Sequence, residues 1–188
     1  MTKKLLAGQS RNYALNTSNP NKLKEFERMF ATYDIKLTIS KKEIREIVAS
    51  PISVVVHKAS QLPVDTIVED TSLEVEGAAV GIHVKWLLNH LSSLLGSQVV
   101  WTVLLAYRNL NDQVYVYQGK VKGVLVSPRG EGFGFDPCFQ PVGSAQTLAE
   151  SKPDRYNARA QAVLNFVQKN PLTIQKPIRG WQGRWQQG

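Results

Sequence analysis

The sequence predicts an α/β fold in a single domain. From Tyr13 to Gly96, short apolar segments with strand character alternate with segments whose apolar residues recur at helical spacing. From Gln98 onward, longer β segments follow one another. The 188 residues, of which 43% are hydrophobic and 20% charged, are enough for one globular domain with a sizeable core.

A polar loop separates the first predicted strand from the first predicted helix. Residues Tyr13–Leu15 form the strand, and Asn19 is placed to cap a helix with Pro20 at its first position. Free backbone N–H groups and hydroxyls at a helix N-terminus can bind an anion, and Lys22 stands close by. The pattern therefore indicates either an anion site or plain helix capping.

An acidic pair follows the third predicted strand. Ile35–Ile39 alternates as the second strand, Ser50 opens a second helix, and Thr66–Val68 is a short buried strand. Glu69 and Asp70 come directly after it, where we expect a turn. A buried carboxylate without a partner costs several kcal/mol, so these acids indicate either a bound cation or a solvated turn.

The second half is predicted to be mainly β structure with two helices. Its expected elements, in order, are a Gly/Ala-rich loop (77–81), a helix (84–95), three strands (99–107, 114–117 and 120–126), a glycine-rich aromatic loop (128–137) and a last helix (156–168). We expect residues 1–170 to form the domain. Residues 171–188, which include Trp181, Arg184 and Trp185, are expected to form a polar, aromatic and flexible tail.

The composition narrows the classes of site and partner. A single cysteine, Cys138, excludes an internal disulfide and fits a reducing, cytoplasmic location. With three scattered histidines, the chain has no zinc-type cluster, so a bound metal should be a hard ion held by oxygen. No apolar run reaches the roughly 18 residues that a membrane span needs, so we expect no membrane partner.

The net charge of +8 is unevenly distributed along the chain. Residues 1–60 carry a net charge of +6, residues 61–150 carry −4 and residues 151–188 carry +6. Basic ends around an acidic middle suit an anionic ligand held by cations together with a metal held by acids. The same charge also leaves nucleic-acid binding open, although charge alone is weak evidence for it.

Four segments together resemble the inosine triphosphate pyrophosphatase family. They fall in the family's order and span the chain up to about residue 167. The segments are Thr17–Lys22, Val68–Leu73, Pro128–Gly130 with Phe133–Phe139, and Ala149–Glu150 followed by Arg159.

The resemblance implies an elongated two-lobed, mixed-sheet fold with a central cleft, usually a homodimer. It implies Mg²⁺-dependent hydrolysis of a nucleoside triphosphate to the monophosphate and pyrophosphate. Inosine, deoxyinosine and xanthosine triphosphates are the expected substrates, and no stable nucleic-acid partner is expected.

The resemblance also assigns roles to individual residues. Asp70 orients or deprotonates the attacking water, and the metal is bound by Glu46 and Asp70, with Glu69 as a further candidate. The phosphates are held by four residues: Thr17, Asn19, Lys22 and Lys58. The base is bound by five: Phe133, Phe135, Asp136, Asn157 and Arg159.

The sequence departs from the family where the base is chosen. The family carries Ser-His-Arg at the start of the last helix, whereas this chain has Asn157, Ala158 and Arg159. The preceding lysine of the family aligns with Pro153, with Lys152 beside it. Two alternatives stay open, namely the same chemistry on a different modified nucleotide and a nucleotide-binding protein that has lost turnover.

Overall fold

A mixed β-sheet is the centre of the molecule in the computed structural model, which describes residues 11–78 and 84–187. The strand order is β2-β1-β3-β4-β5-β6, and β7 also pairs with β5. The strands are β1 (Asn12–Asn16), β2 (Lys36–Ser40), β3 (Thr66–Val75), β4 (Gln98–Arg108), β5 (Val114–Leu125), β6 (Phe139–Pro141) and β7 (Thr173–Gln175). The α-helices are α1 (Pro20–Ala31), α2 (Pro51–Ser60), α3 (Val84–Asn89), α4 (Leu91–Leu94) and α5 (Ala158–Val167).

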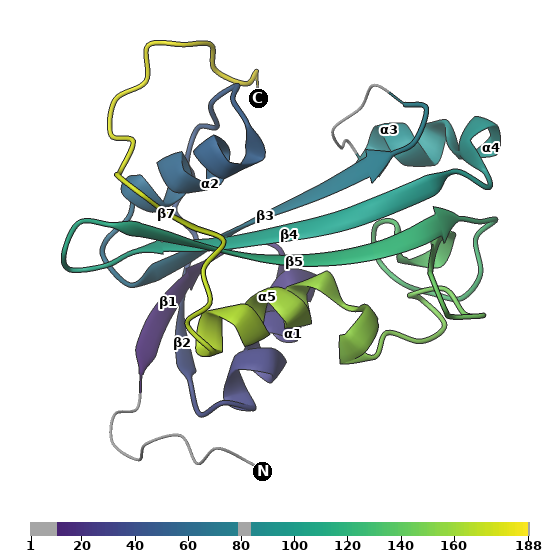
Figure 1. Ribbon diagram of the computed structural model, residues 1–188, viewed down its shortest axis with the longest axis horizontal. Coiled ribbons are helices and arrows are strands. Elements are labelled where there is room, and N and C mark those ends of the chain that lie inside the picture. The colour runs from purple at the N-terminus through teal and green to yellow at the C-terminus, as the bar shows by residue number, and fades with distance from the viewer. Residues whose placement is uncertain (1–10, 79–83, 188) are drawn as a thin grey trace.

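The sheet combines a parallel part with a long antiparallel part. Strand β1 pairs in parallel with β2 and with β3, and α1 and α2 lie in the connections between these strands. Strands β3, β4 and β5 form an antiparallel series that gives the molecule its long axis (Figure 1). The predicted α/β class and the elongated mixed sheet are confirmed.

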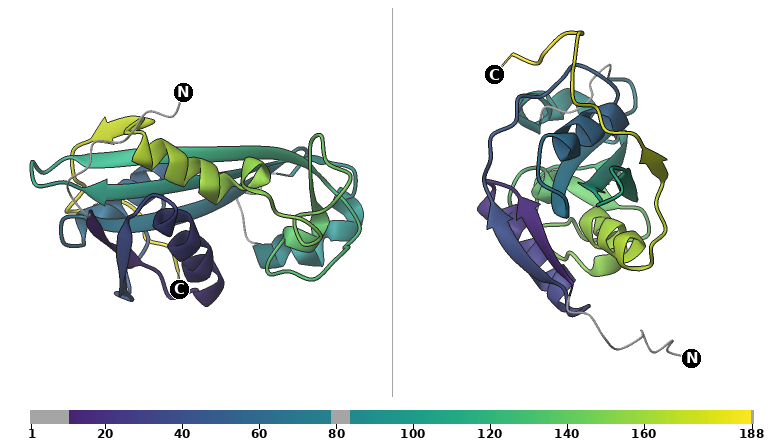
Figure 2. Two further views of the ribbon diagram at one scale, coloured as in Figure 1. Left: turned by 90° about the horizontal axis from the view of Figure 1, so that it is seen from below. Right: turned by 90° about the vertical axis from the view of Figure 1, so that its left-hand side faces the viewer.

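Helices cover both faces of the sheet. Figure 1 shows α1 and α5 on one face and α2 on the other, with α3 and α4 at the far end of the long strands. Figure 2 shows the molecule from below, where it is again elongated, and end-on along its long axis. Strand β4 alternates between the faces: Val103 and Leu105 belong to the core cluster shared with α1 and α5, whereas Leu104 and Ala106 belong to the cluster shared with α2.

Three polar N-caps fix where the main helices begin. Asn19 caps α1, Ser50 caps α2 and Asn157 caps α5, each by accepting hydrogen bonds from backbone N–H groups of the first turn. Gly119 of β5 allows α5 to lie close to the sheet, because a Cβ at that position would lie 1.9 Å from the Ala158 carbonyl oxygen. The start of α5 is therefore held against the long strands.

The expected acidic turn is wrong. Glu69 and Asp70 lie inside β3, which continues to Val75. The pairing of β3 with β4 joins Glu69 to Leu105 and Asp70 to Leu104, and this long antiparallel ladder outweighs the local turn signal.

Two other boundaries also differ from the prediction. The segments expected as two strands form the single strand β5, and the helix expected at 84–95 is divided into α3 and α4 at His90. The loop expected at 77–81 lies partly outside the described residues.

The predicted tail makes backbone contacts with the rest of the protein. Strand β7 pairs with β5 through the register Val116–Thr173, and Trp185 forms an antiparallel bridge with Ile47. These are backbone contacts to distant segments, which periodicity in a short polar sequence does not reveal.

No helix in the described part of the chain is long and apolar enough to cross a membrane.

Candidate active site

The candidate site lies where one edge of β3 becomes free. Strand β1 pairs with β3 only at Ala14–Thr66 and Leu15–Ile67, so within the described chain β3 has no strand partner on this edge from Val68 onward. The end of β1, the N-terminus of α1 and the connection before α2 meet there. Ligands of open α/β sheets bind at such carboxyl ends of parallel strands.

Successive residues of β3 point to opposite faces of the sheet, and this separates the two acids. Glu69 points toward α1, where its carboxylate meets Lys22. Asp70 points toward α2, where it meets Lys58. The free edge of β3 therefore has one carboxylate–lysine pair on each face.

On the α2 face, two carboxylates share one ammonium. The Lys58 ammonium nitrogen lies 3.2 Å from a Glu46 carboxylate oxygen and 3.8 Å from an Asp70 oxygen. It also donates a hydrogen bond of 3.0 Å to the Glu69 carbonyl oxygen on the free edge. Lys58, predicted to contact phosphate, thus lies between the two residues predicted to hold the metal.

Asp70 has the electrostatic character of a proton acceptor near neutral pH. The pKa of its carboxyl is raised to about 6, chiefly by burial; Lys58 opposes the shift, and Glu69 and Glu46 contribute to it. A general base works best when its pKa lies near the operating pH. The repulsion among these carboxylates also favours a bound cation.

On the α1 face, Glu69 holds Lys22 in place. Its carboxylate lies 2.7 Å from the Lys22 ammonium and also accepts a hydrogen bond from the Thr71 hydroxyl. Burial alone would raise the pKa of the Glu69 carboxyl, but the charges of Lys22 and Arg159 and these hydrogen bonds hold that pKa below its ordinary value. Glu69 is thus ionised and engaged away from Asp70 and Glu46.

The loop before α1 uses its polar groups for capping. The Asn19 side chain accepts hydrogen bonds from the N–H groups of Asn21 and Lys22, and the Thr17 hydroxyl accepts one from the N–H group of Asn19. The free N–H groups expected from the sequence are therefore already bonded, because the cap residues satisfy them. What this helix end offers an anion is its positive dipole and the Lys22 ammonium.

A pocket of about 420 Å³ opens beside Lys22 on the α1 face. It is bounded by α1, β3, the glycine-rich loop and α5. Its lining residues are Asn19, Lys22, Thr71, Phe133, Gly134, Phe135, Asp136 and Arg159. The volume suits a nucleotide-sized ligand.

The two predicted base-stacking aromatics have different environments. Phe135 is 5% exposed, and its ring packs edge-on against Trp101 in the core. Phe133 is half-buried and lies beneath two cations, with Lys152 at 5.1 Å and Arg159 at 5.6 Å from its ring centre. Gly134 between them has a positive φ of 62°, which turns the backbone at the pocket wall.

Arg159 is a buried cation in the wall of the pocket. It is 2% exposed and donates a 2.8 Å hydrogen bond to Glu25 of α1. Its guanidinium lies 5.1 Å from the ring centre of Trp101, while its Nε has no hydrogen-bond partner in the described residues. An unpartnered buried N–H group is costly, so this donor suits a ligand acceptor.

Lys152 belongs to the same charged cluster as Arg159, although it was not among the site residues predicted from the sequence. Its ammonium lies 2.9 Å from an Asp136 oxygen and 2.9 Å from a Glu25 oxygen. Burial raises the pKa of the Asp136 carboxyl, and the Lys152 ammonium opposes that shift. The signal in the sequence was present, since Lys152 adjoins the position where the family has its lysine.

Asn157 and Ala158, the departures from the family pattern, are structural residues here. The Asn157 side chain caps α5 by accepting hydrogen bonds from the N–H groups of Arg159 and Ala160. Asn157 is 1% exposed, and Ala158 is fully buried in the core. The amide predicted to read the base is thus engaged in capping, which serine also does well.

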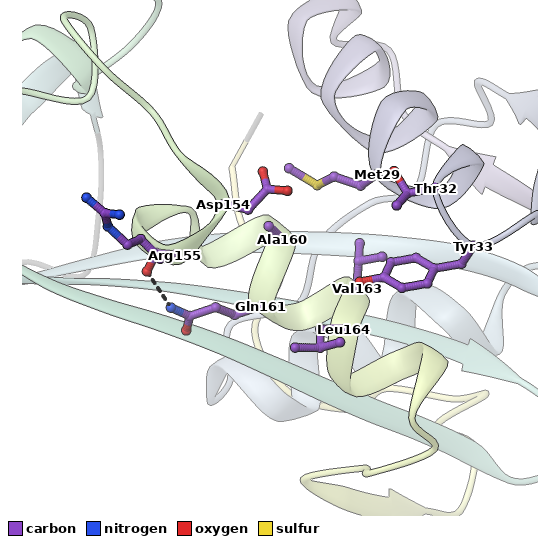
Figure 3. A pocket seen from close by; sticks show the side chains of 9 residues that line it. All are labelled: Met29, Thr32, Tyr33, Asp154, Arg155, Ala160, Gln161, Val163 and Leu164. Atoms are coloured by element: carbon purple, nitrogen blue, oxygen red, sulfur yellow. Dashed lines mark hydrogen bonds between the residues drawn. The ribbon is translucent and has the colours of Figure 1, made fainter. Parts of the chain in front are cut away.

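A second hollow between α1 and α5 lacks a comparable arrangement. It has a volume of about 230 Å³ and is lined largely by carbon atoms. Figure 3 shows Met29, Val163 and Leu164 around it. Its acidic residue, Asp154, forms an ion pair with Arg28 at 2.8 Å. Among its described lining residues there is no pair of carboxylates, and the Arg155 guanidinium lies 4.9 Å from the ring centre of Tyr156.

The α2-face carboxylates fit a hard divalent cation. Among the described residues no group of three or more His, Cys, Asp and Glu side chains could hold a metal. Mg²⁺, however, is often bound by one or two carboxylates and completes its shell with water and substrate phosphate. Glu46 and Asp70 already converge on a cation, the Lys58 ammonium, so their donor set suits such an ion.

Comparisons with known proteins identify relatives of this chain. The family model described as the Ham1 family matches residues 13–169. The chain is 30% identical to the inosine triphosphate pyrophosphatase of Yarrowia lipolytica over 159 residues, which are 76% of this chain and 85% of that protein. It is 29% identical to the protein of the same name from Batrachochytrium dendrobatidis over 181 residues, with 84% and 95% covered.

Solved structures show the same fold. A HAM1 protein from Coxiella burnetii superposes with a TM-score of 0.68 at 21% identity and covers 85% of this chain and 98% of its own. This likeness shows that the α/β fold with its central mixed sheet is shared.

Proposed function

The chain belongs to the Ham1 family, and we propose that it hydrolyses purine nucleoside triphosphates with non-standard bases to the monophosphate and pyrophosphate. The proposed substrates are inosine, deoxyinosine and xanthosine triphosphates. The observation that carries the proposal is the convergence of Glu46 and Asp70 on one cation, across the free edge of β3 from the pocket that Lys22 lines. Such an enzyme would remove damaged nucleotides from the cellular pool.

The free edge of β3 allows the substrate to use both faces of the sheet. We propose that the base lies in the pocket on the α1 face, with its ring against Phe133 and a carbonyl accepting from Arg159. The triphosphate then passes Lys22 and crosses the free edge toward Asp70. Lys22 and Lys58 stand on the two sides of this route and offset the phosphate charge.

Asp70 is the proposed general base, which takes a proton from the water that attacks the α-phosphorus. Its raised pKa suits that role, and Lys58 keeps a cation beside the carboxylate. Glu46 and Asp70 are the proposed ligands of the divalent ion, which we propose to be Mg²⁺. When bound, that ion would neutralise phosphate charge and polarise the reacting phosphate. We propose that Glu69 acts mainly by fixing Lys22.

One assay tests the function. Release of pyrophosphate is measured with Mg²⁺ from standard purine, deaminated purine and pyrimidine triphosphates, with the Asp70→Asn variant as the control for contaminating activity. Preference for inosine and xanthosine triphosphates supports the proposal. If only a pyrimidine or another modified nucleotide is cleaved, the substrate assignment is wrong. If no nucleotide releases pyrophosphate, the result favours a protein that binds nucleotide without turnover.

The homodimer and the cytoplasmic location stay predictions. Light scattering on the purified protein tests the first, and fractionation of the source cells tests the second.

A further inference from the structure

The end of the tail lies beside the segment that carries Glu46. The Val48 N–H group donates to the Arg184 carbonyl at 2.9 Å, and the Gln186 N–H group donates to the Glu46 carbonyl at 2.9 Å. The Gln186 side chain donates to the Ile47 carbonyl at 3.1 Å. These bonds form a short antiparallel pairing over the N-terminal end of α2, where Figure 1 shows the tail returning above that helix.

The tail is also fastened at the other end of α2. The Ile178 N–H group donates to the Ser60 hydroxyl at 2.9 Å, and the Gln61 side chain donates to the Ile178 carbonyl at 3.0 Å. The Ile178 side chain packs against the core cluster on the α2 face. Two sets of contacts therefore hold the tail, one at each end of α2.

Trp185 is the side chain that joins the tail to the body. Its ring packs edge-on against His57 of α2, with ring centres 5.5 Å apart. The Arg45 guanidinium lies 5.0 Å from the ring centre on the Glu46 side. Arg45 and His57 flank Glu46 and Lys58 in the sequence, so the ring packs against both segments that supply the α2-face cluster.

The segment that carries Glu46 has little else to fix its backbone. Residues 41–46 form no helix or strand. Among the described residues, the backbone hydrogen bonds of Glu46, Ile47 and Val48 go to Arg184 and Gln186. The buried Ile47 side chain anchors the segment, but the direction of the Glu46 carboxylate depends on the backbone that the tail pairs with.

We propose that Trp185 is a positioning residue for Glu46, and that the tail is a strap that completes the metal side of the active site. The inference rests on the proposed function. Trp185 lies outside residues 13–169, which the family model matches. Removing a group that orients a metal ligand lowers metal affinity or activity by about 10–100-fold in other proteins. Trp185→Ala should have an effect of this size.

The first experiment measures binding of Mn²⁺ to the metal-free full chain by electron paramagnetic resonance, together with hydrogen exchange of the Val48 amide. We expect Trp185→Ala to weaken Mn²⁺ binding about tenfold and to expose the Val48 amide. Trp185→Phe, which keeps an aromatic ring against His57, should retain both the Mn²⁺ affinity and the protection of the Val48 amide. Ile174→Ala, an exposed change in β7, is the matched control and should leave both unchanged.

A double-mutant cycle separates positioning from general stability. In the Glu46→Gln background, Trp185→Ala should cause no further loss of Mn²⁺ binding, because the carboxylate on which it acts is gone. Unchanged Mn²⁺ binding in folded Trp185→Ala, equal losses in both backgrounds, or no Mn²⁺ binding by the wild type would each overturn the inference. Absence of pyrophosphate release would overturn the proposed function alone, since the Mn²⁺ measurement does not require turnover.

Discussion

The Lys152 ammonium lies 2.9 Å from a carboxylate oxygen of Asp136, next to the ring on which we propose that the base stacks. The pair is largely buried, since the two side chains are 15% and 7% exposed. A buried cation–carboxylate pair fixes the direction of both groups and leaves little freedom to adapt to a wrong base. Base selection should therefore depend on Lys152.

Lys152→Met tests this dependence, because methionine keeps most of the side-chain volume and removes the charge. It also leaves the buried Asp136 carboxylate without its ammonium, so the kinetics are compared on protein shown to be folded by circular dichroism. We expect kcat/KM for inosine triphosphate to fall about 10–100-fold, because a hydrogen bond to a charged group contributes about 1.5–3 kcal/mol. The kcat/KM for guanosine triphosphate should fall less, so the preference for inosine triphosphate over guanosine triphosphate should narrow. Steady-state kinetics on both nucleotides check this, and Lys120→Met, at an exposed position of β5, is the matched control. Equal losses on both nucleotides would contradict a role in selection.

The second prediction concerns Lys22 and the triphosphate. Lys22→Met alone leaves the buried Glu69 carboxylate without its ammonium, which costs about 3–5 kcal/mol of stability for a broken buried pair. Lys22→Met combined with Glu69→Gln removes both charges and should fold normally.

In this double variant we expect triphosphate affinity to fall about 10–100-fold while nucleoside affinity stays unchanged, because a charge-assisted contact to phosphate is lost. Calorimetry with inosine and inosine triphosphate measures the two affinities. Equal weakening of both ligands would assign Lys22 to the base pocket or to the fold.

The sequence predicted the framework of the site better than its details. The caps at Asn19 and Ser50 and the first two strands were predictable, because capping chemistry and alternation act locally. The extent of β3 was not, since its ladder with β4 joins residues that are far apart in the chain. The residues around Glu69 and Asp70 carry no sign of this pairing, so the end of the strand could not be predicted from them.

The residues of the site show the same division between local and distant signals. Asp70, Glu46 and Lys58 were assigned through the family resemblance, and the structure brings them together. The separation of Glu69 from Asp70 follows only once both are known to lie in one strand. The contact of Trp185 with the Glu46 segment joins residues 46–48 to residues 184–186, and no periodic pattern announces it.

The third prediction concerns the missing serine and histidine. Asn157→Ser should change the free energy of unfolding by less than about 0.5 kcal/mol, because asparagine and serine cap helices about equally well. Ala158→His should destabilise the protein by about 1–3 kcal/mol, since Ala158 is fully buried and added volume overpacks the core. We expect it not to widen the preference for inosine triphosphate. Urea unfolding and kinetics check both variants, and a stable Ala158→His protein with sharper selection would mean that the pocket accepts the ring.

The fourth prediction concerns Asp70 and turnover. Asp70→Asn keeps the shape of the side chain but removes the proton acceptor and the negative charge of one metal ligand. We expect turnover to fall about 10²–10⁴-fold, the scale of general-base and electrostatic contributions. Glu74→Gln, an exposed change on the same strand, should keep wild-type turnover. Near-normal turnover in folded Asp70→Asn would remove Asp70 from the mechanism.

The same variant should make the metal-free protein more stable at neutral pH. Burial raises the Asp70 pKa from 3.8 to about 6, so between these values the folded state binds more protons than the unfolded state. The free energy of unfolding therefore falls as pH rises through this window. At pH 7.5 the ionised carboxylate lowers the free energy of unfolding by up to about 3 kcal/mol, and Asp70→Asn should raise it by about 1–3 kcal/mol. Near pH 4 the gain should be lost. Urea unfolding with a chelator at both pH values measures the difference, and a variant less stable than the wild type at pH 7.5 would show that Asp70 stabilises the fold rather than straining it.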